Sequence, residues 1–285
     1  MKIAIVGLGL IGASLGRAIV KYTSHEVYGF DISGDVLKRA DELSAHTRAL
    51  SFEDFKSVDI VFFALNPSDT IDEMRRICPL LKDGATVADT CGNKRIICAE
   101  MKALKEKYPH LHFIGTHPMA GREYSGIGYS DPNLFKGAYI LLVPVSNDLA
   151  PVEILKKLSA KIGARDVEIC SAERHDEMIA YTSQLAHVVS SCYVQNPHSV
   201  GHAGYSAGSF ADLTRVARLN PDMWTELFLE NRDNLMSCIK DMKKRLDKIY
   251  CALEAEDDKA LREFLAYGTG CKENADRVSK ERNHE

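Results

Sequence analysis

The sequence has no pair of cysteines in a CxxC arrangement and no uninterrupted apolar run of about 18 residues. Its eight cysteines are spread from Cys78 to Cys271. A chain of 285 residues can bury enough apolar surface to fold without disulfides. These absences argue against a disulfide scaffold and against a membrane protein, and we expect reduced thiols.

The sequence also lacks an excess of positive charge. Its 36 Lys and Arg residues against 40 Asp and Glu residues leave a net charge of -4. No global positive field is therefore available to hold nucleic acid or an anionic membrane, and an anionic substrate needs a local basic site. The opening residues MKIAIVGLG enter a strand-like pattern without a charged leader or an apolar signal segment, so we expect a cytoplasmic location.

A metal site has little support. His198 and His202 are four residues apart, but the segment NPHSVGHAGYSAG around them contains too much proline and glycine for the helical geometry that aims two histidines at one ion. We expect a loop there and no bound metal.

The first half of the chain alternates short apolar strands with segments of helical length. This rhythm predicts a doubly wound α/β domain of Rossmann type, with a mostly parallel sheet. The expected strands are Lys2 to Val6, Glu26 to Phe30, Ile60 to Leu65, Ala85 to Asp89, His112 to Gly115 and Ala138 to Val143.

The second half has a helical rhythm. Ser171 to Val194 contains neither glycine nor proline, and Pro221 to Leu265 is rich in Leu, Met, Lys and Glu. We predict an all-α domain whose apolar faces need a second copy for burial, hence a homodimer. The expected domains are 1–168 and 169–285, and the polar tail after Gly270 is expected to fray.

A glycine-rich turn directly follows the first strand. Gly7, Gly9 and Gly12 have the GxGxxG spacing, which permits a tight turn, a close approach to a pyrophosphate and contact between helix and strand. Asp31 ends the second strand, where a carboxylate accepts hydrogen bonds from the adenosine ribose, and its charge favours NAD over NADP. The remaining residues that we assign to the cofactor site are Leu8, Leu10, Ile11, Asn66 and Cys91.

Three polar features have bland explanations when taken singly. Asp212 and Arg215 are three residues apart, as in many surface ion pairs of helices. His187 follows Gln184 by three residues in an apolar helix, where a lone histidine is commonly a core residue. His117 stands at the end of a strand, in the segment FIGTHPMAGREYSGIGYSD.

Four segments together give these residues a context. GLGLIGASL, HPMAGREYSG, LFKGAYILLVP and DLTRVARLNPDMW occur in this order, and the chain resembles the prephenate and arogenate dehydrogenases of tyrosine biosynthesis along nearly its whole length. The resemblance implies a Rossmann-type domain, a helical dimerisation domain, and NAD- or NADP-dependent oxidative decarboxylation of prephenate or arogenate. It also implies that His117 is catalytic, that Arg215 binds a substrate carboxylate and that His187 lines the substrate pocket. The further substrate-binding candidates are Gln184, Arg122, Glu123 and Asp212.

Two positions depart from the family pattern. The segment that often reads D-x-G-S-x-K is DTCGNK here, so Gly92, preceded by Cys91, replaces a serine that would assist the catalytic histidine. Where many relatives have H-L-P-H, this chain has Gln184-Leu185-Ala186-His187, so one pocket histidine is an amide.

Two other functions compete. Dehydrogenases of 3-hydroxyacids and imine-reducing enzymes with a helical second domain typically use a lysine on the interdomain helix, and Ser171 to Val194 contains none. A non-catalytic NAD(H)-sensing protein would have no use for both His117 and Arg215, and would usually carry a module for DNA or a partner. An enzyme is favoured, because a neutral histidine can accept a proton at cytoplasmic pH and an arginine can grip a carboxylate.

Overall fold

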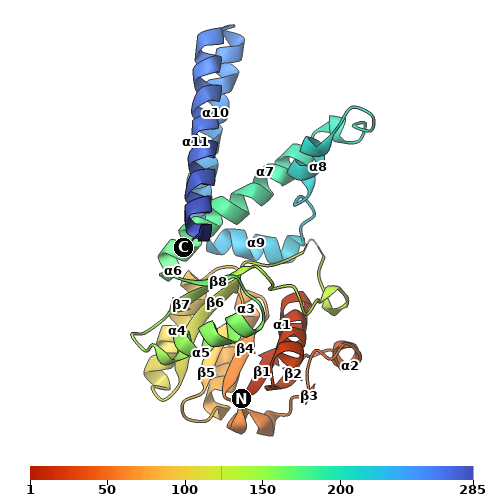
Figure 1. Ribbon diagram of the computed structural model, residues 1–285, viewed down its shortest axis with the longest axis vertical. Coiled ribbons are helices and arrows are strands. Elements are labelled where there is room, and N and C mark those ends of the chain that lie inside the picture. Colours follow the sequence, from red (N-terminus) through yellow and green to blue (C-terminus); the bar gives the residue numbers. More distant parts are fainter. Residues whose placement is uncertain (123, 285) are drawn as a thin grey trace. The chain divides into compact units, whose positions relative to one another are not determined.

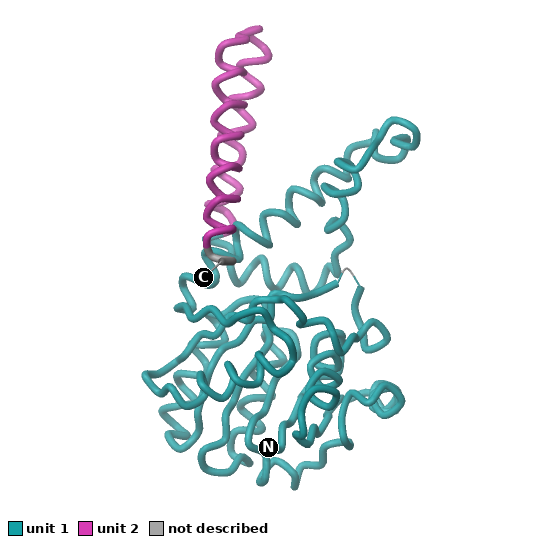
Figure 2. Tube along the Cα trace, viewed as in Figure 1, with its two compact units in different colours: residues 1–234 teal, residues 235–285 magenta. Residues whose placement is uncertain are grey.

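The computed structural model describes residues 1–122 and 124–284, which divide into two compact units, 1–234 and 235–285 (Figure 2). In the first unit, strands alternate with helices and are then followed by helices alone (Figure 1). The strands are β1 (Lys2–Val6), β2 (Glu26–Phe30), β3 (Arg48–Ala49), β4 (Ile60–Phe63), β5 (Thr86–Asp89), β6 (His112–Pro118), β7 (Tyr139–Pro144) and β8 (Asp166–Ile169). The helices among the strands are α1 (Leu10–Tyr22), α2 (Gly34–Glu42), α3 (Pro67–Ile77), α4 (Arg95–Lys107) and α5 (Ala150–Lys161). Those that follow are α6 (Ala172–Ile179), α7 (Leu185–Val194), α8 (Gly208–Thr214), α9 (Pro221–Glu230), α10 (Arg232–Glu254) and α11 (Asp258–His284).

The eight strands form one sheet in the order β3-β2-β1-β4-β5-β6-β7-β8. All neighbouring strands are parallel except β6 and β7, so the mostly parallel sheet expected from the sequence is confirmed. The sequence missed the two edge strands, β3 and β8. Neither strand contains a fully buried residue, so neither shows in the sequence the apolar pattern by which a strand is recognised.

Successive side chains of each strand point to opposite sides of the sheet, so both faces carry apolar residues that must be buried. Helices cover both faces. In β1, Ile3 and Ile5 pack in a core with α1, α2 and α5. Ala4 and Val6 belong to the opposite core, with α3 and α4. This is the doubly wound arrangement, in which ligands bind beyond the carboxyl ends of the strands.

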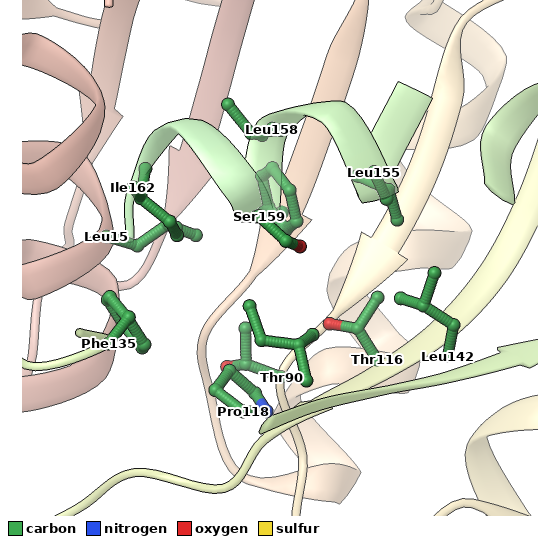
Figure 3. A pocket seen from close by; sticks show the side chains of 12 residues that line it. Leu15, Thr90, Thr116, Pro118, Phe135, Leu142, Leu155, Leu158, Ser159 and Ile162 are labelled. Atoms are coloured by element: carbon green, nitrogen blue, oxygen red, sulfur yellow. The ribbon is translucent and has the colours of Figure 1, made fainter. Parts of the chain in front are cut away.

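A small cavity of about 20 Å³ lies in the first of these cores, between α5 and the sheet (Figure 3). Apolar side chains dominate its wall, among them Leu15, Leu155, Leu158 and Leu142. A space of this size holds one water at most, and an apolar wall offers that water few hydrogen-bond partners. We interpret it as a packing defect rather than a substrate site.

The segment expected as one helix from Ser171 to Val194 consists of α6, a π-helical turn at Ala180–Gln184, and α7. The second unit contains most of α10 and all of α11. The expectation of a frayed tail was wrong, because α11 continues to His284. Ion pairs one turn apart, Lys272 with Asp276 and Arg277 with Glu281, support its last turns.

Within the described parts of the chain, 1–122 and 124–284, no helix combines the length and the apolar character needed to cross a bilayer.

Candidate active site

The turn between β1 and α1 has the geometry of a dinucleotide-binding loop. Gly7 adopts φ +93°, a conformation that residues with a side chain rarely adopt. A Cβ on Gly12 would lie 1.9 Å from the carbonyl oxygen of Gly7, so this position accepts no side chain. A Cβ on Gly9 would meet no atom within 4 Å, so the backbone there faces open space. A ligand can therefore closely approach the backbone of this turn.

Helix α1 begins at Leu10 and Ile11 without a capping side chain and without an acidic residue in its first turn. Its first N–H groups are therefore available to an anion such as a pyrophosphate. Leu8, the residue between Gly7 and Gly9, is fully buried, so its side chain fixes the turn to the core.

Asp31 stands just beyond β2 and is held against the glycine turn. Its carboxylate accepts hydrogen bonds from the backbone N–H of Leu8 at 2.9 Å and from that of Ser33 at 3.0 Å. Two carboxylate oxygens still have lone pairs for ribose hydroxyls. Asn66 directly precedes α3 and follows β4, the strand beside β1. Since α1 and α3 cover opposite faces of the sheet, the loop from β1 to α1 and the loop from β4 to α3 flank its switch point. The residues of these loops, together with Asp31, fit a dinucleotide.

Cys91 and Gly92 follow β5. The thiol of Cys91 is buried 3.3 Å from Oγ1 of Thr70, and burial raises its pKa, so it stays protonated. Only the backbone of Cys91 is a plausible ligand contact. A Cβ on Gly92 would lie 3.3 Å from Leu227 of α9, so a serine would be crowded at this position.

His117 lies in β6 near its carboxyl end, in a chain of hydrogen-bonded side chains. Its Nδ1 is 2.9 Å from Nε2 of His175, and Nδ1 of His175 is 2.7 Å from the Asp176 carboxylate. Asp176 also accepts the backbone N–H groups of Lys94 at 2.7 Å and Arg95 at 3.0 Å. Helix α6 is thereby joined to the loop between β5 and α4.

This environment keeps the imidazole of His117 neutral. Burial lowers the pKa of His117 well below its usual value, and the neighbouring His175 and the positive charge of Lys94 act in the same direction. As a residue, His117 is half-buried, whereas His175 and Asp176 are each 1% exposed. His117 can therefore meet a ligand while its partners cannot.

A buried ion pair lies beneath this chain. Lys94 and Asp89 contact each other, and both side chains are fully buried. Asp89 also accepts the N–H of Cys91 at 2.8 Å and of Thr116 at 3.1 Å. The pair therefore connects the ends of β5 and β6, next to His117.

Gln184 lies in a buried amide network at the base of α7. Its Nε2 donates to Oδ1 of Asn93 at 3.1 Å, and its Oε1 accepts from Nδ2 of Asn231 at 2.9 Å. Asn231 also donates to the backbone carbonyl of Asp176 at 2.8 Å. Gln184 is 2% exposed, so its amide serves this network rather than an open pocket.

His187 and Arg215 belong to a second cluster. His187 donates from Nδ1 to the carbonyl of Val216 at 2.9 Å, which leaves Nε2 as an acceptor, and its ring centroid is 4.0 Å from that of Trp224. Burial lowers the pKa of His187, and the nearby charge of Arg215 lowers it further. Arg215 is exposed at the end of α8, and Asp212 is an exposed residue of that helix.

Arg122 belongs to the loop that follows β6. It forms an exposed ion pair with Asp131, and the backbone N–H of Asp131 donates to Ser14 of α1 at 2.9 Å. This loop is therefore tied to the nucleotide half of the site. Glu123 lies outside the described residues.

No group of three or more His, Cys, Asp or Glu side chains in the described portion of the chain is arranged to hold a metal.

Sequence reasoning missed His175 and Asp176, although a signal was present. In α6 they share a helical face with Ala172 and Ile179, and all four are buried. Polar residues at positions of an apolar stripe are costly unless they are paired, so they point to a buried polar site.

Comparison with known proteins agrees with this architecture. The model of the prephenate dehydrogenase nucleotide-binding domain matches residues 15–168, and that of the prephenate dehydrogenase dimerization domain matches residues 171–267. Prephenate dehydrogenase of Lactococcus lactis subsp. cremoris is 32% identical over 279 residues, which cover 94% of this chain and 75% of that protein. The prephenate dehydrogenase of Bacillus subtilis is 30% identical and covers 91% of this chain and 72% of its own length.

A solved structure gives the same result. Prephenate dehydrogenase from A. aeolicus, in complex with hydroxyphenyl propionate and NAD+, superimposes with a TM-score of 0.84 at 26% identity and covers 98% of both chains. With both family models matched in order and two curated relatives at 30% identity or more, the chain belongs to the prephenate dehydrogenase family of oxidoreductases.

Proposed function

We propose that this chain catalyses the NAD-dependent oxidative decarboxylation of prephenate to 4-hydroxyphenylpyruvate in tyrosine biosynthesis, with His117 as the base. The observation that carries the proposal is the placement of a neutral, half-buried histidine at the carboxyl edge of a nucleotide-binding sheet, in a chain of this family. Ligands of doubly wound sheets bind at that edge.

The reaction makes two demands on the protein. The hydroxyl proton of the substrate must be removed as hydride leaves the carbinol carbon, and the carboxylates must be held in place. Neutral His117 meets the first demand by accepting the proton. Arg215 meets the second, because its planar guanidinium stays charged and binds a carboxylate through two hydrogen bonds. His187, beside Arg215, contributes an acceptor at Nε2.

Bound NAD would accept the hydride. The carbinol C–O bond becomes a carbonyl, so the substrate loses a hydride, which NAD would take, and the hydroxyl proton, which His117 holds. When the ring carboxylate leaves as carbon dioxide, the electron pair of the broken C–C bond enters the ring and reaches the oxygen. That oxygen takes the proton back from His117, and an aromatic phenol results. Proton and electrons balance without a further reactant.

The other candidate residues have subsidiary roles in this proposal. The turn from Gly7 to Gly12, together with Asp31, Asn66 and the backbone of Cys91, binds NAD. Arg122 and Asp212 border the substrate, and Glu123 is retained as a candidate there. The engaged amide of Gln184 favours an indirect role, through Asn93 and Asn231.

A paired assay tests the function. NADH formation is followed by absorbance with prephenate and, separately, with arogenate. Turnover of prephenate supports the proposal, and turnover of arogenate alone would reassign the enzyme as an arogenate dehydrogenase. A flat trace with both substrates, in protein that binds NAD, would instead favour a non-catalytic NAD(H)-sensing protein.

Asp31→Ala is expected to weaken NAD binding and to narrow the preference for NAD over NADP. The ribose hydroxyls lose their acceptor, and the repulsion of a 2'-phosphate disappears. Dissociation constants for both cofactors measure the effect. Asp35→Ala, an exposed acid in the first turn of α2, is the matched control. An unchanged preference in Asp31→Ala would count against the assignment.

We further propose a cytoplasmic homodimer with domains 1–168 and 169–285. Leu246, Tyr250 and Leu253 form an apolar stripe on α10 at helical spacing, and each is more than half exposed. The match of residues 171–267 to a dimerization domain supports this proposal.

Light scattering is expected to give twice the monomer mass of 31.6 kDa. Leu246→Glu combined with Tyr250→Glu should shift the mass toward the monomer, because charges replace apolar surface in the interface. Lys244→Glu, an exposed charge change on the same helix, is the control. A monomer mass for the unaltered protein at micromolar concentrations would rule out the dimer.

A further inference from the structure

We propose that His175 and Asp176 are positioning residues for His117, which hold it in the tautomer that carries its proton on Nδ1 and leaves Nε2 free to accept the proton of the substrate. The inference rests on the proposed function, and it adds two residues that act through His117 rather than on the substrate.

The tautomer follows from the order of the hydrogen bonds. Asp176 accepts the backbone N–H groups of Lys94 and Arg95, and the Arg95 guanidinium lies 3.2 Å away, so its carboxylate is ionised. Burial alone would raise the pKa of Asp176, but donation from His175 and from these N–H groups lowers it. An ionised carboxylate only accepts hydrogen bonds, so Nδ1 of His175 must carry a proton.

The same reasoning extends to His117. A neutral His175 with its proton on Nδ1 has an unprotonated Nε2, which is an acceptor. The atom 2.9 Å from this acceptor is Nδ1 of His117, which must therefore donate. The proton of His117 is then on Nδ1, and Nε2 is the basic atom.

No other tautomer of the pair satisfies every contact. If His117 carried its proton on Nε2, two unprotonated nitrogens would face each other at 2.9 Å, or His175 would have to turn an unprotonated Nδ1 toward a carboxylate. Both arrangements place lone pairs against each other in a buried region, where unsatisfied polar atoms are costly. The half-buried His117 ring also would lose its function, because an N–H cannot accept the substrate proton.

The hydrogen bonds that join His117, His175 and Asp176 also stabilise the state that follows proton transfer. Protonated His117 keeps its hydrogen bond from Nδ1–H to His175, and this proton can be shared with His175, which in turn donates to Asp176. The charged groups around the pair are Asp176 and Arg95 on one side, and the ion pair of Lys94 with Asp89 on the other. Because the charges of the ion pair largely cancel, Asp176 is the group placed to balance a positive charge on the two histidines.

This assignment also supplies what position 92 lacks. Gly92 has no side chain with which to orient His117, and Leu227 crowds the space where a serine Cβ would lie. Orientation comes instead from α6, 58 residues beyond His117 in the sequence. The basic atom is therefore set only when α6 is docked on the loop between β5 and α4.

Two substitutions of His175 separate hydrogen bonding from packing. His175→Gln can place Oε1 near the position of Nε2 and so keeps an acceptor for His117, whereas His175→Phe keeps a ring but offers no acceptor. We expect kcat to fall by about 10²-fold or more in His175→Phe, and to stay within roughly 10-fold of the unaltered enzyme in His175→Gln. The KM of the substrate and the dissociation constant of NAD should change little in both variants.

His112→Asn is the matched control, because His112 is a histidine of the same strand that also pairs with a carboxylate, that of Asp148. We expect nearly unaltered kcat in this variant. In a His117→Ala background, His175→Phe should lower the residual activity no further, since residues that act as a unit are not additive. A His175→Phe enzyme that folds and retains normal kcat would overturn the proposal, as would additive losses in the double variant.

A spectroscopic test does not depend on activity. Nitrogen-15 shifts of the histidine rings, measured where the rings are neutral, distinguish protonated from unprotonated nitrogens, and the His117 signals are those missing in His117→Ala. We expect a protonated Nδ1 in the unaltered protein. In Asp176→Asn, the oxygen of the new amide should face the two donors of Arg95, so its NH₂ group points to His175. Nδ1 of His175 must then accept, its Nε2 must donate to His117, and both tautomers should be reversed.

A protonated Nε2 on His117 in the unaltered protein would overturn the proposal. If the unaltered protein turned over neither prephenate nor arogenate, the proposed function would fail, while the nitrogen shifts would still decide the tautomer.

Discussion

Replacing His117 with alanine is expected to lower kcat by about 10²- to 10⁴-fold, with little change in the KM of prephenate. The interaction of a base with the substrate proton strengthens as hydride leaves, so its loss is felt in the transition state and hardly in the ground state. Steady-state kinetics measure the effect, and an unchanged dissociation constant of NAD shows that the variant is folded. A His117→Ala enzyme with normal kcat would remove His117 from the chemistry.

Arg215→Ala is the contrasting variant in the same experiment. A residue that holds a carboxylate in both ground and transition states should mainly raise KM when it is removed. Loss of a charged, hydrogen-bonded contact should cost about 2 to 5 kcal/mol in kcat/KM. If the two variants gave the same pattern of kcat and KM, the division of roles between His117 and Arg215 would be wrong.

The pH dependence of kcat/KM should show the neutral state of His117. Protonated imidazole cannot accept a proton, so activity is present above the pKa of His117 and is lost as the pH falls through it. Since burial, the neighbouring His175 and the positive charge of Lys94 lower this pKa well below 6.5, the acid limb should lie below pH 6.5. The limb should be absent from the residual activity of His117→Ala. A limb above pH 6.5 would contradict the low pKa.

Lys94→Met is expected to lower the free energy of unfolding by about 3–5 kcal/mol. The variant leaves the charge of Asp89 fully buried and without its cation, although the N–H groups of Cys91 and Thr116 still donate to it. For a domain of this size, such a loss lowers the melting temperature by on the order of 10 °C. Thermal unfolding at matched protein concentration measures it.

The control for this variant is Lys56→Met. Lys56 pairs with Glu53 at 2.6 Å, but the two side chains are 66% and 82% exposed. Exposed pairs are worth less than about 1 kcal/mol, so this variant should melt close to the unaltered protein. Equal melting temperatures for Lys94→Met and Lys56→Met would show that the buried pair does not stabilise the fold.

Much of the fold was predictable because its signals are local. Six strands follow from short apolar runs, and the turn from Gly7 to Gly12 follows from backbone conformations that only glycine adopts readily. The edge strands β3 and β8 were missed because they bury no complete residue. The end of α11 was missed because ion pairs along the helix replaced the apolar pattern.

The candidate site divides in the same way. The sequence by itself determined the family, the nucleotide turn with Asp31, and the presence of His117 at a strand end, since each depends on short segments that can be recognised without knowing their contacts. Only the tertiary structure decided that His117 bonds His175, that Gln184 is enclosed by Asn93 and Asn231, and that Lys94 and Asp89 pair out of contact with water. The physical reason is that the partners of His117 and Gln184 lie far from them in the sequence and are brought close only by the packing of α6 and α9 on the end of the sheet, which also shields the Lys94–Asp89 pair from water.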